Sequence, residues 1–255
     1  MKDIKPNKSE KVLYSERRFL EGPRSRWREL KFLFKVMSEF IKGFQKLHFV
    51  GPCVTVFGSA RFKEDHPYYQ TTVELSAEIS KLGFTVITGG GPGIMEAANK
   101  GAFEAGGQSI GCNIVLPHEQ NENPYVHTSI EFKYFFVRKT LLTKYSYAFV
   151  IMPGGWGTMD EMFEALTLIQ TGKIQEFPVV LFGKEYWKSL IALIDDMVFN
   201  KTVSAAEIKE YLLITDSIDE AIMHIKKHAI GKFDLKTTTI VKPKKWLGEW
   251  FNKAS

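Results

Sequence analysis

Three glycines follow an apolar run at residues 148–152 and precede a stretch with helical character. The segment from Pro153 to Glu161 reads PGGWGTMDE. Glycine lets the backbone approach a ligand closely, and the N-terminus of a following helix presents unpaired N–H groups at the positive end of its dipole. The segment therefore predicts an anion site. The alternative is a tight strand-to-helix turn in which Thr158 is the N-cap and Glu161 completes a capping box.

A second glycine cluster, GGGPG at residues 89–93, follows another apolar run, and Gly58-Ser59 follows a third. The Gly-x-Gly-x-x-Gly fingerprint of dinucleotide sites fails because the position it needs is Ile94. No Gly-Lys pair precedes Ser or Thr, as a P-loop requires. Two glycine-rich helix entries at one edge of a sheet can still hold a mononucleotide, one near the phosphate and one near the base or ribose.

The charged candidates are Arg138, Lys139 and Glu161. The first two belong to the predicted helix before the strand that ends in the glycine segment, so they either face the same ligand or form a solvated helix face. In the first turn of a helix, the carboxylate form of Glu161 would be stabilised by the dipole. Such a group suits orienting water or opposing a developing cation better than donating a proton.

Short apolar runs alternate with helical patterns from residue 54 onward. This alternation predicts a parallel sheet covered on both faces, in which ligands bind beyond the carboxyl ends of the strands. We therefore predict an α/β fold with a doubly wound, Rossmann-like parallel sheet. The predicted strands are 54–57, 84–88, 109–115, 148–152 and 179–182, and the predicted helices are 67–82, 94–105, 134–146, 158–171, 185–200 and 217–228.

Both ends of the chain differ from this pattern. Apolar residues recur at steps of three and four after Gly22-Pro23, which predicts one long amphipathic helix; they are Trp27, Leu30, Phe34, Met37, Ile41 and Phe44. That stripe either packs on the same domain or forms a subunit interface, and residues 246–251 read as a second amphipathic segment. We predict a helical extension over 1–50, a nucleotide-binding α/β catalytic domain over 51–228 and a C-terminal tail over 229–255.

The composition restricts the functional class. With 255 residues, 44% of them hydrophobic, the chain can bury one α/β core with terminal extensions. Its net charge is +5, with both ends basic and the middle of the chain acidic. The basic residues of the ends are interleaved with apolar ones, so we expect solvated helix faces rather than a nucleic-acid site. Without an apolar run of ~20 residues or a signal-like start, we expect a cytoplasmic protein without membrane association. Cys53 and Cys112 are predicted to be reduced core residues, and no metal site is expected.

Four stretches together resemble the Lonely Guy family of cytokinin riboside 5′-monophosphate phosphoribohydrolases and related nucleotide 5′-monophosphate nucleosidases. They are residues 56–59, 89–97, 138–139 and 153–161, and the likeness extends from 54 to about 195. The string Pro-Gly-Gly-x-Gly-Thr-x-x-Glu is highly specific. The resemblance implies a homo-oligomer that hydrolyses the N-glycosidic bond of purine nucleoside 5′-monophosphates without a cofactor, giving the free base and ribose 5-phosphate.

The resemblance also assigns roles to individual residues. The catalytic pair falls on Arg138 and Glu161, with Lys139 beside it as a substrate contact. The phosphate loop falls on Gly154, Gly155, Gly157 and Thr158, and nucleotide contacts fall on Ser59, Gly89, Gly90 and Gly91, with Met95, Glu119 and Thr167 as further candidates. The string GGGPGIMEA is the form of a broader bacterial branch rather than the plant-like GGGSxGLM, so the preferred base is left open.

Two other functions compete with this one. The family was long labelled lysine decarboxylase, but such an enzyme needs a Schiff-base lysine for pyridoxal phosphate, typically after histidine, and the chain has no His-Lys pair. The second is a non-catalytic module that binds or carries a nucleotide or cofactor. Such a module needs the glycine loops but not Arg138 and Glu161, so the presence of both favours the enzyme.

Overall fold

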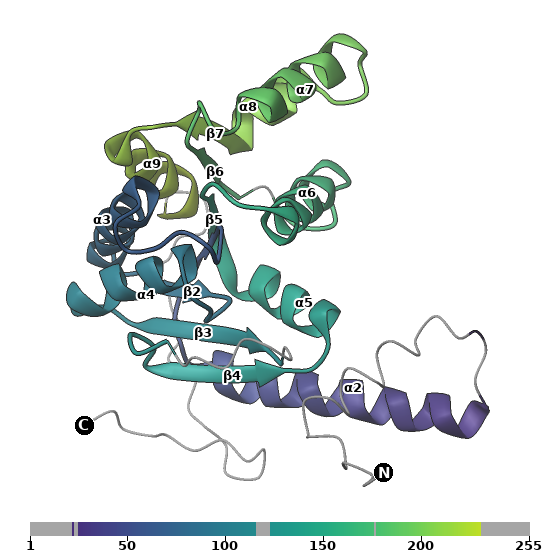
Figure 1. Cartoon of the computed structure of the whole chain (residues 1–255). Coiled ribbons are helices and arrows are strands. Elements are labelled where there is room, and N and C mark those ends of the chain that lie inside the picture. Colours follow the sequence, from purple (N-terminus) through teal and green to yellow (C-terminus); the bar gives the residue numbers. More distant parts are fainter. Residues whose placement is uncertain (1–21, 23–24, 116–122, 176, 231–255) are drawn as a thin grey trace, which may run out of the picture.

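The centre of the computed structural model, which describes residue 22 and residues 25–115, 123–175 and 177–230, is a seven-stranded sheet of order β4-β3-β2-β1-β5-β6-β7 (Figure 1). All neighbouring strands run parallel. This confirms the predicted α/β parallel sheet. The strands are β1 (Cys53–Phe57), β2 (Thr85–Thr88), β3 (Ser109–Ile114), β4 (Thr128–Phe132), β5 (Ser146–Ile151), β6 (Val179–Phe182) and β7 (Leu212–Thr215).

Helices cover both faces of this sheet, so the central strands are buried on both sides and their sequences are almost continuously apolar. On one face lie α3 (Pro67–Lys81), α4 (Ile94–Glu104) and α9 (Ile218–Ile225). On the other lie α5 (Phe135–Tyr145), α6 (Trp156–Gln170) and α7 (Lys188–Phe199). The remaining elements are α2 (Arg26–Leu47) beside β4 and α5, α8 (Ala205–Tyr211) before β7, and a π-helical turn (Lys226–Ile230) after α9.

The two cysteines lie in the sheet. Cys53 in β1 and Cys112 in β3 are both free and buried, as predicted. Burial raises the pKa of the Cys112 thiol to about 12, which leaves it protonated and unreactive at neutral pH.

Three described elements were not predicted from the sequence: β4, β7 and α8. β4 is an edge strand in which buried and exposed residues alternate, so it lacks a continuous apolar run. Strand β7 is only four residues long, three of them apolar, and directly follows α8, which makes helix and strand hard to distinguish by periodicity.

The start of α6 also differs from the prediction. The helix begins at Trp156 rather than at residue 158, and its N-cap is Gly155, which makes no side-chain capping hydrogen bond. The proposed N-cap role of Thr158 and its capping box with Glu161 are therefore wrong. Glycine at the N-cap allows the helix to begin directly within the glycine segment.

The topology reverses between β1 and β5 at the centre of the sheet. From β1 the chain runs outward to β4, and from β5 it runs outward to β7, so the loops after these two strands diverge and open a crevice. Two backbone hydrogen bonds hold the loops around it: Ser59 N donates to Pro153 O at 2.9 Å, and Ile94 N donates to Ser59 O at 3.0 Å. The three glycine-containing strand ends thus meet at one edge, as predicted.

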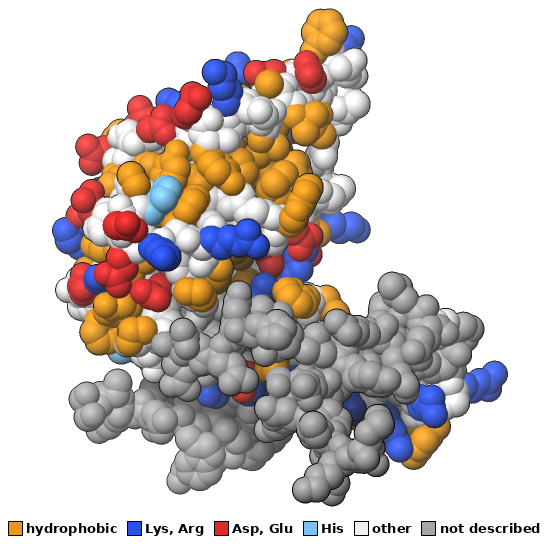
Figure 2. All heavy atoms as spheres, in the orientation of Figure 1, with side chains coloured by type: hydrophobic (Ala, Val, Ile, Leu, Met, Phe, Trp, Pro, Cys, Tyr) orange, Lys and Arg blue, Asp and Glu red, His pale blue; other side chains and the backbone are white. Residues whose placement is uncertain are grey.

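The surface of the domain carries mixed charge. Figure 2 shows Lys and Arg side chains interspersed with Asp and Glu over the viewed face, with no large basic patch on its described part. Among the described residues, no helix combines the length and the apolar character needed to cross a membrane.

Candidate active site

A cleft with a volume of about 860 Å³ opens at the carboxyl edge of the sheet. Clefts of several hundred Å³ are typical of small-ligand sites. Its walls come from the loops after β1 and β2, the start of α6, and side chains of α5. The predicted site residues that line it are Ser59, Gly89, Gly90, Gly91, Met95, Arg138, Gly154, Gly155, Gly157, Thr158 and Glu161.

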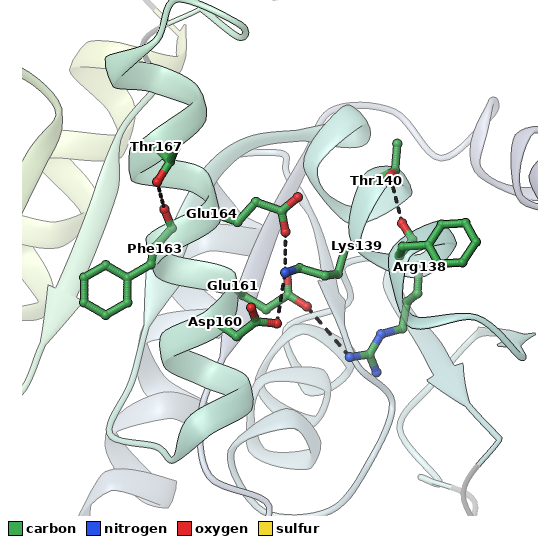
Figure 3. A network of polar contacts seen from close by, with 9 residues as sticks. Arg138, Lys139, Thr140, Asp160, Glu161, Phe163, Glu164 and Thr167 are labelled. Carbon is green, nitrogen blue, oxygen red and sulfur yellow. Dashed lines mark hydrogen bonds and ion pairs between the residues drawn. The ribbon is translucent and has the colours of Figure 1, made fainter. Parts of the chain in front are cut away.

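Two predicted site residues do not line the cleft, and a third is not among the residues that the structure describes. Lys139 is directed toward carboxylates of α6 and is not among the residues that line the cleft. Thr167 is exposed on α6, where its hydroxyl donates to Phe163 O at 2.7 Å (Figure 3). Glu119 lies outside the described residues.

The glycine loop after β5 leads directly into the N-terminus of α6. A Cβ atom at Gly154 would overlap with the side chain of Thr158, so glycine is needed for the backbone to pass beneath that residue. Tyr186 Oη donates to Gly154 O at 2.9 Å, and this hydrogen bond helps to hold the glycine loop in place. The first N–H groups of a helix have no partner within it, so this N-terminus and the buried Thr158 hydroxyl suit a bound anion.

The glycine loop after β2 is held by a buried polar network. Gly90 N donates to Thr88 Oγ1 at 2.9 Å, and that hydroxyl donates to Asn99 Oδ1 at 2.6 Å. The φ angle of Gly90 is 71°, which favours glycine. A Cβ atom at Gly89 would lie 3.5 Å from Arg138 Nη1, so the Arg138 side chain extends from α5 to this loop.

Arg138 and Glu161 face each other between α5 and α6 (Figure 3). Arg138 Nη2 lies 3.8 Å from Glu161 Oε1, and both side chains are largely buried. The guanidinium also lies over the ring of Phe135, with its carbon 5.2 Å from the ring centroid. A permanently charged group is thus held beside a titratable one at the wall of the cleft.

Burial raises the pKa of the Glu161 carboxyl to about 7. The charges of Arg138 and Lys139 act in the opposite direction, whereas Glu164 and Asp160 raise the pKa further. Glu161 lies in the second turn of α6, so its predicted place in the first turn is wrong. Near neutral pH the carboxyl exists in both protonation states and can accept or donate a proton, which the sequence did not predict.

Lys139 joins α5 to α6. Its Nζ donates to Asp160 Oδ2 at 2.9 Å and also bonds to Glu164 Oε2. Burial lowers the pKa of Lys139, but the hydrogen bonds to these two carboxylates outweigh that effect, and the pKa lies above its usual value. Lys139 is thus a charged link between the helices that carry Arg138 and Glu161.

Several residues of the cleft were missed in the sequence. Asn113 lies at the carboxyl end of β3; its Oδ1 is buried, has no hydrogen-bond partner among the described residues, and fills the space that a Cβ atom of Gly90 would occupy. The rule that ligands bind beyond strand ends could have identified it. No pattern points to Arg61 or Tyr186. Trp156, which is 87% exposed, lies within the predicted glycine segment but was not itself predicted to be a site residue.

A family model and several plant enzymes match this chain in sequence. A family model described as "Possible lysine decarboxylase" matches residues 95–225. A cytokinin riboside 5′-monophosphate phosphoribohydrolase of Arabidopsis thaliana is 29% identical over 195 residues, which cover 74% of this chain and 88% of that protein. A second such enzyme of A. thaliana is 31% identical over 135 residues, 51% of this chain and 62% of that protein. One of Oryza sativa subsp. japonica is 25% identical over 174 residues, 67% and 71% of the two chains.

Solved structures share the fold. The molybdenum cofactor carrier protein from Chlamydomonas reinhardtii matches with a TM-score of 0.51 and 25% identity, over 69% of this chain and 97% of that chain. The molybdenum cofactor binding protein from the phototrophic bacterium Rippkaea orientalis has a TM-score of 0.50 and 23% identity, over 69% and 96% of the two chains. The second likeness concerns the fold alone.

Proposed function

Because this chain belongs to the Lonely Guy family, we propose that it is a phosphoribohydrolase that cleaves the N-glycosidic bond of purine nucleoside 5′-monophosphates. The products are the free base and ribose 5-phosphate. The observation that carries the proposal is the pair Arg138 and Glu161, 3.8 Å apart, in the cleft that both glycine loops line. Three relatives whose names give this activity support it.

The 5′-phosphate binds at the N-terminus of α6. Backbone N–H groups of the Gly154 loop, the Thr158 hydroxyl and the helix dipole all favour an anion there. The phosphate takes no part in the bond cleavage. Its binding energy serves to hold the ribose beside Glu161.

Glu161 acts in its carboxylate form. A water oxygen attacks C1′ while Glu161 accepts a proton from that water, and the electrons of the breaking C–N bond pass to the base. The positive charge that develops on the ribose is opposed by the carboxylate, as in other glycoside hydrolysis. The proton on Glu161 is then available to the departing base. Arg138 stays protonated and holds the substrate in register.

Lysine decarboxylation, which the description of the family model names, fits the site less well. That reaction requires a lysine amine free to form a Schiff base. Lys139, the lysine next to the proposed catalytic pair, is protonated and bonded to two carboxylates of α6. This supports hydrolysis.

Transport of a cofactor is the second candidate, because a carrier protein of molybdenum cofactor shares the fold at 25% identity. A carrier requires the glycine loops but has no need of a buried acid with a pKa of about 7. The two functions differ in whether bound ligand is consumed, so they can be separated directly.

The test is product analysis on a panel of nucleotides that includes AMP and isopentenyladenosine monophosphate. Chromatography should detect free base and ribose 5-phosphate in equal amounts, and their absence with Arg138→Ala excludes a contaminating enzyme. If wild-type protein binds nucleotides or a pterin-type cofactor but releases no base from any nucleotide, the hydrolase proposal is wrong and the carrier reading gains support.

We further propose that the protein is a homo-oligomer. The stripe predicted on the N-terminal helix lies on α2 and is exposed, with Phe34 61% exposed. An exposed row of large apolar side chains on a helix is typical of an interface. The exposure of the stripe therefore favours a contact between subunits over packing of the stripe on its own domain.

A further inference from the structure

Helix α2 is anchored to the domain through one buried carboxylate. Glu39 is 9% exposed, and its Oε1 and Oε2 accept hydrogen bonds from Lys133 N at 3.0 and 3.1 Å. Oε2 also accepts from Tyr134 N at 3.3 Å. A buried carboxylate is costly unless donors satisfy it, so these bonds determine where α2 docks. Both donors directly precede α5.

Helix α5 has no side-chain cap of its own. Its N-cap residue, Tyr134, makes no side-chain capping hydrogen bond, and the third helical position is Val137. In a capping box, a Glu or Gln at that third position accepts from the N-cap N–H. Glu39 provides this acceptor from another helix, and its charge complements the positive end of the α5 dipole.

Tyr134 connects Glu39 to Arg138. Its N–H donates to Glu39, and its carbonyl accepts the N–H of Arg138 at 3.3 Å in the first turn of α5. Arg138 therefore lies one turn from the capped end. Fraying of that turn would displace the guanidinium that faces Glu161.

Two further contacts pack α2 against α5 and the residue before it. The ring of Phe32 packs edge-on against Tyr134, with centroids 5.3 Å apart. A Cβ atom at Gly43 would overlap with buried Leu141 in α5, so the two helices approach closely there. Figure 1 shows α2, in purple, running along the sheet edge beside β4 and α5.

We propose that Glu39 is a positioning residue for the hydrolysis: its carboxylate fixes the start of α5 and thereby holds the Arg138 side chain opposite Glu161. The inference rests on the proposed function. Helix α2 precedes the region that resembles the family. The inference assigns this helix a role in positioning Arg138.

If Glu39 positions Arg138, changing Glu39 should alter the pH dependence of the hydrolysis. The charged groups that face Glu161 are Arg138 and Lys139 from α5 and Asp160 and Glu164 from α6. The two cations of α5 oppose the effect of burial on the Glu161 pKa. Loosening the start of α5 weakens this opposition, so the pKa of Glu161 should rise above its present value of about 7.

The experiment compares Glu39→Gln and the milder Glu39→Asp with the control Lys42→Met. Lys42 also anchors α2, but its Nζ donates to Glu131 O at 2.8 Å on β4 rather than bonding to the backbone at the start of α5. For each variant, kcat and kcat/KM on AMP are measured against pH, and hydrogen exchange is followed at residues 133–138. Near-ultraviolet circular dichroism checks that each variant is folded.

We expect kcat to fall between about tenfold and a hundredfold in Glu39→Gln, the loss typical of a slightly misplaced catalytic group. The midpoint of the acid limb should move to higher pH, and residues 133–138 should exchange faster. Glu39→Asp should show the same changes to a smaller extent, and it decides the question if the glutamine variant does not fold. Lys42→Met should keep the wild-type pH profile.

The inference would be overturned if the folded Glu39 variants keep the wild-type kcat and the wild-type acid limb of the pH profile, and differ only in a lower melting temperature. Glu39 would then stabilise the fold without positioning Arg138. If the proposed function is wrong, the result differs from this outcome, because the wild-type protein itself releases no base. In that case the exchange measurement still tests whether Glu39 holds the start of α5.

Discussion

Glu161 is the single residue on which the proposed chemistry most depends, because it is a buried acid whose pKa lies near neutrality. We expect Glu161→Gln to abolish base release from AMP while nucleotide affinity and fold are kept, since the amide preserves the shape of the side chain but cannot accept the proton. Isothermal titration with AMP and a turnover assay on the same preparation test this. Activity near that of the wild type would refute the catalytic assignment.

The pH profile provides a second test at this residue. If the carboxylate is the active form, kcat/KM should rise with pH through a midpoint near 7 for the free enzyme. A profile that falls through the same midpoint would show that the protonated acid is required instead.

The raised pKa of Glu161 also affects stability. Between its ordinary value of 4.5 and about 7, the folded protein binds the proton of Glu161 more tightly than the unfolded chain does. Its contribution to the free energy of unfolding is therefore fully present below pH 4.5 and is lost as the pH rises through about 7. Urea denaturation of the wild type and of Glu161→Gln at pH 5 and pH 8 tests this. The wild type should lose this part of its free energy of unfolding between pH 5 and pH 8, and Glu161→Gln should not.

The sequence predicted the membership of the site better than its electrostatics. Ser59, Arg138 and Glu161 could be located because glycine-rich strand ends and a specific motif mark them. The environment of Glu161 could not, because its burial depends on how closely α5 packs against α6. For the same reason Lys139 was predicted to contact substrate, whereas its partners on α6 became visible only with that packing.

Among the elements, the start of α6 is the proposed phosphate site and should therefore govern the choice of substrate. Its glycine loop and Thr158 favour an anion, so we expect AMP to be cleaved at least about a hundredfold more efficiently than adenosine. Loss of the phosphate should lower kcat as well as raise KM, because the ribose is then no longer held beside Glu161. Steady-state kinetics on both substrates decide this, and similar kcat/KM values would contradict a phosphate site.

Thr158→Ala extends this test. The variant should reduce the preference for AMP over adenosine without improving cleavage of adenosine, because it removes one donor to the phosphate and creates no new contact to the nucleoside. Thr167→Ala is a suitable control on the same helix, since that hydroxyl is exposed and bonded to the preceding turn. An equal effect of both changes would indicate a general disturbance of α6.

The elements that the sequence predicted well are those with a strong period. Continuous apolar runs identified the inner strands, and the predicted helices lie within a few residues of those observed. The edge strand β4 and the short β7 lack such runs, so tertiary pairing rather than local pattern determines them. The start of α6 was misplaced because glycine acts as its N-cap where Thr158 gave the stronger sequence signal.

Helix α2 connects the site to a row of large apolar side chains that is exposed in the part of the chain that the structure describes. One side of the helix carries Glu39 and Gly43, which dock on α5. Phe34 and Ile41 point in a different direction, because successive residues of a helix are turned by about 100°. The sequence predicted the stripe, but only the docking of the opposite residues shows that it stays exposed.

The exposed apolar stripe of α2 should determine the oligomeric state of the protein. We expect light scattering at micromolar concentration to give a mass of at least twice the 29.1 kDa of one chain, because large apolar side chains in a row are stabilised by burial against a second copy. The double variant Phe34→Glu and Ile41→Glu should reduce the mass to that of a monomer. Phe199→Glu, at a residue on α7 that is 84% exposed, is the matched control and should keep the wild-type mass. A monomeric wild-type protein would refute an interface on α2. Because Glu39 faces the domain and not the stripe, the dissociated variant should still show slow exchange at residues 133–138, so assembly and the positioning of Arg138 can be measured separately.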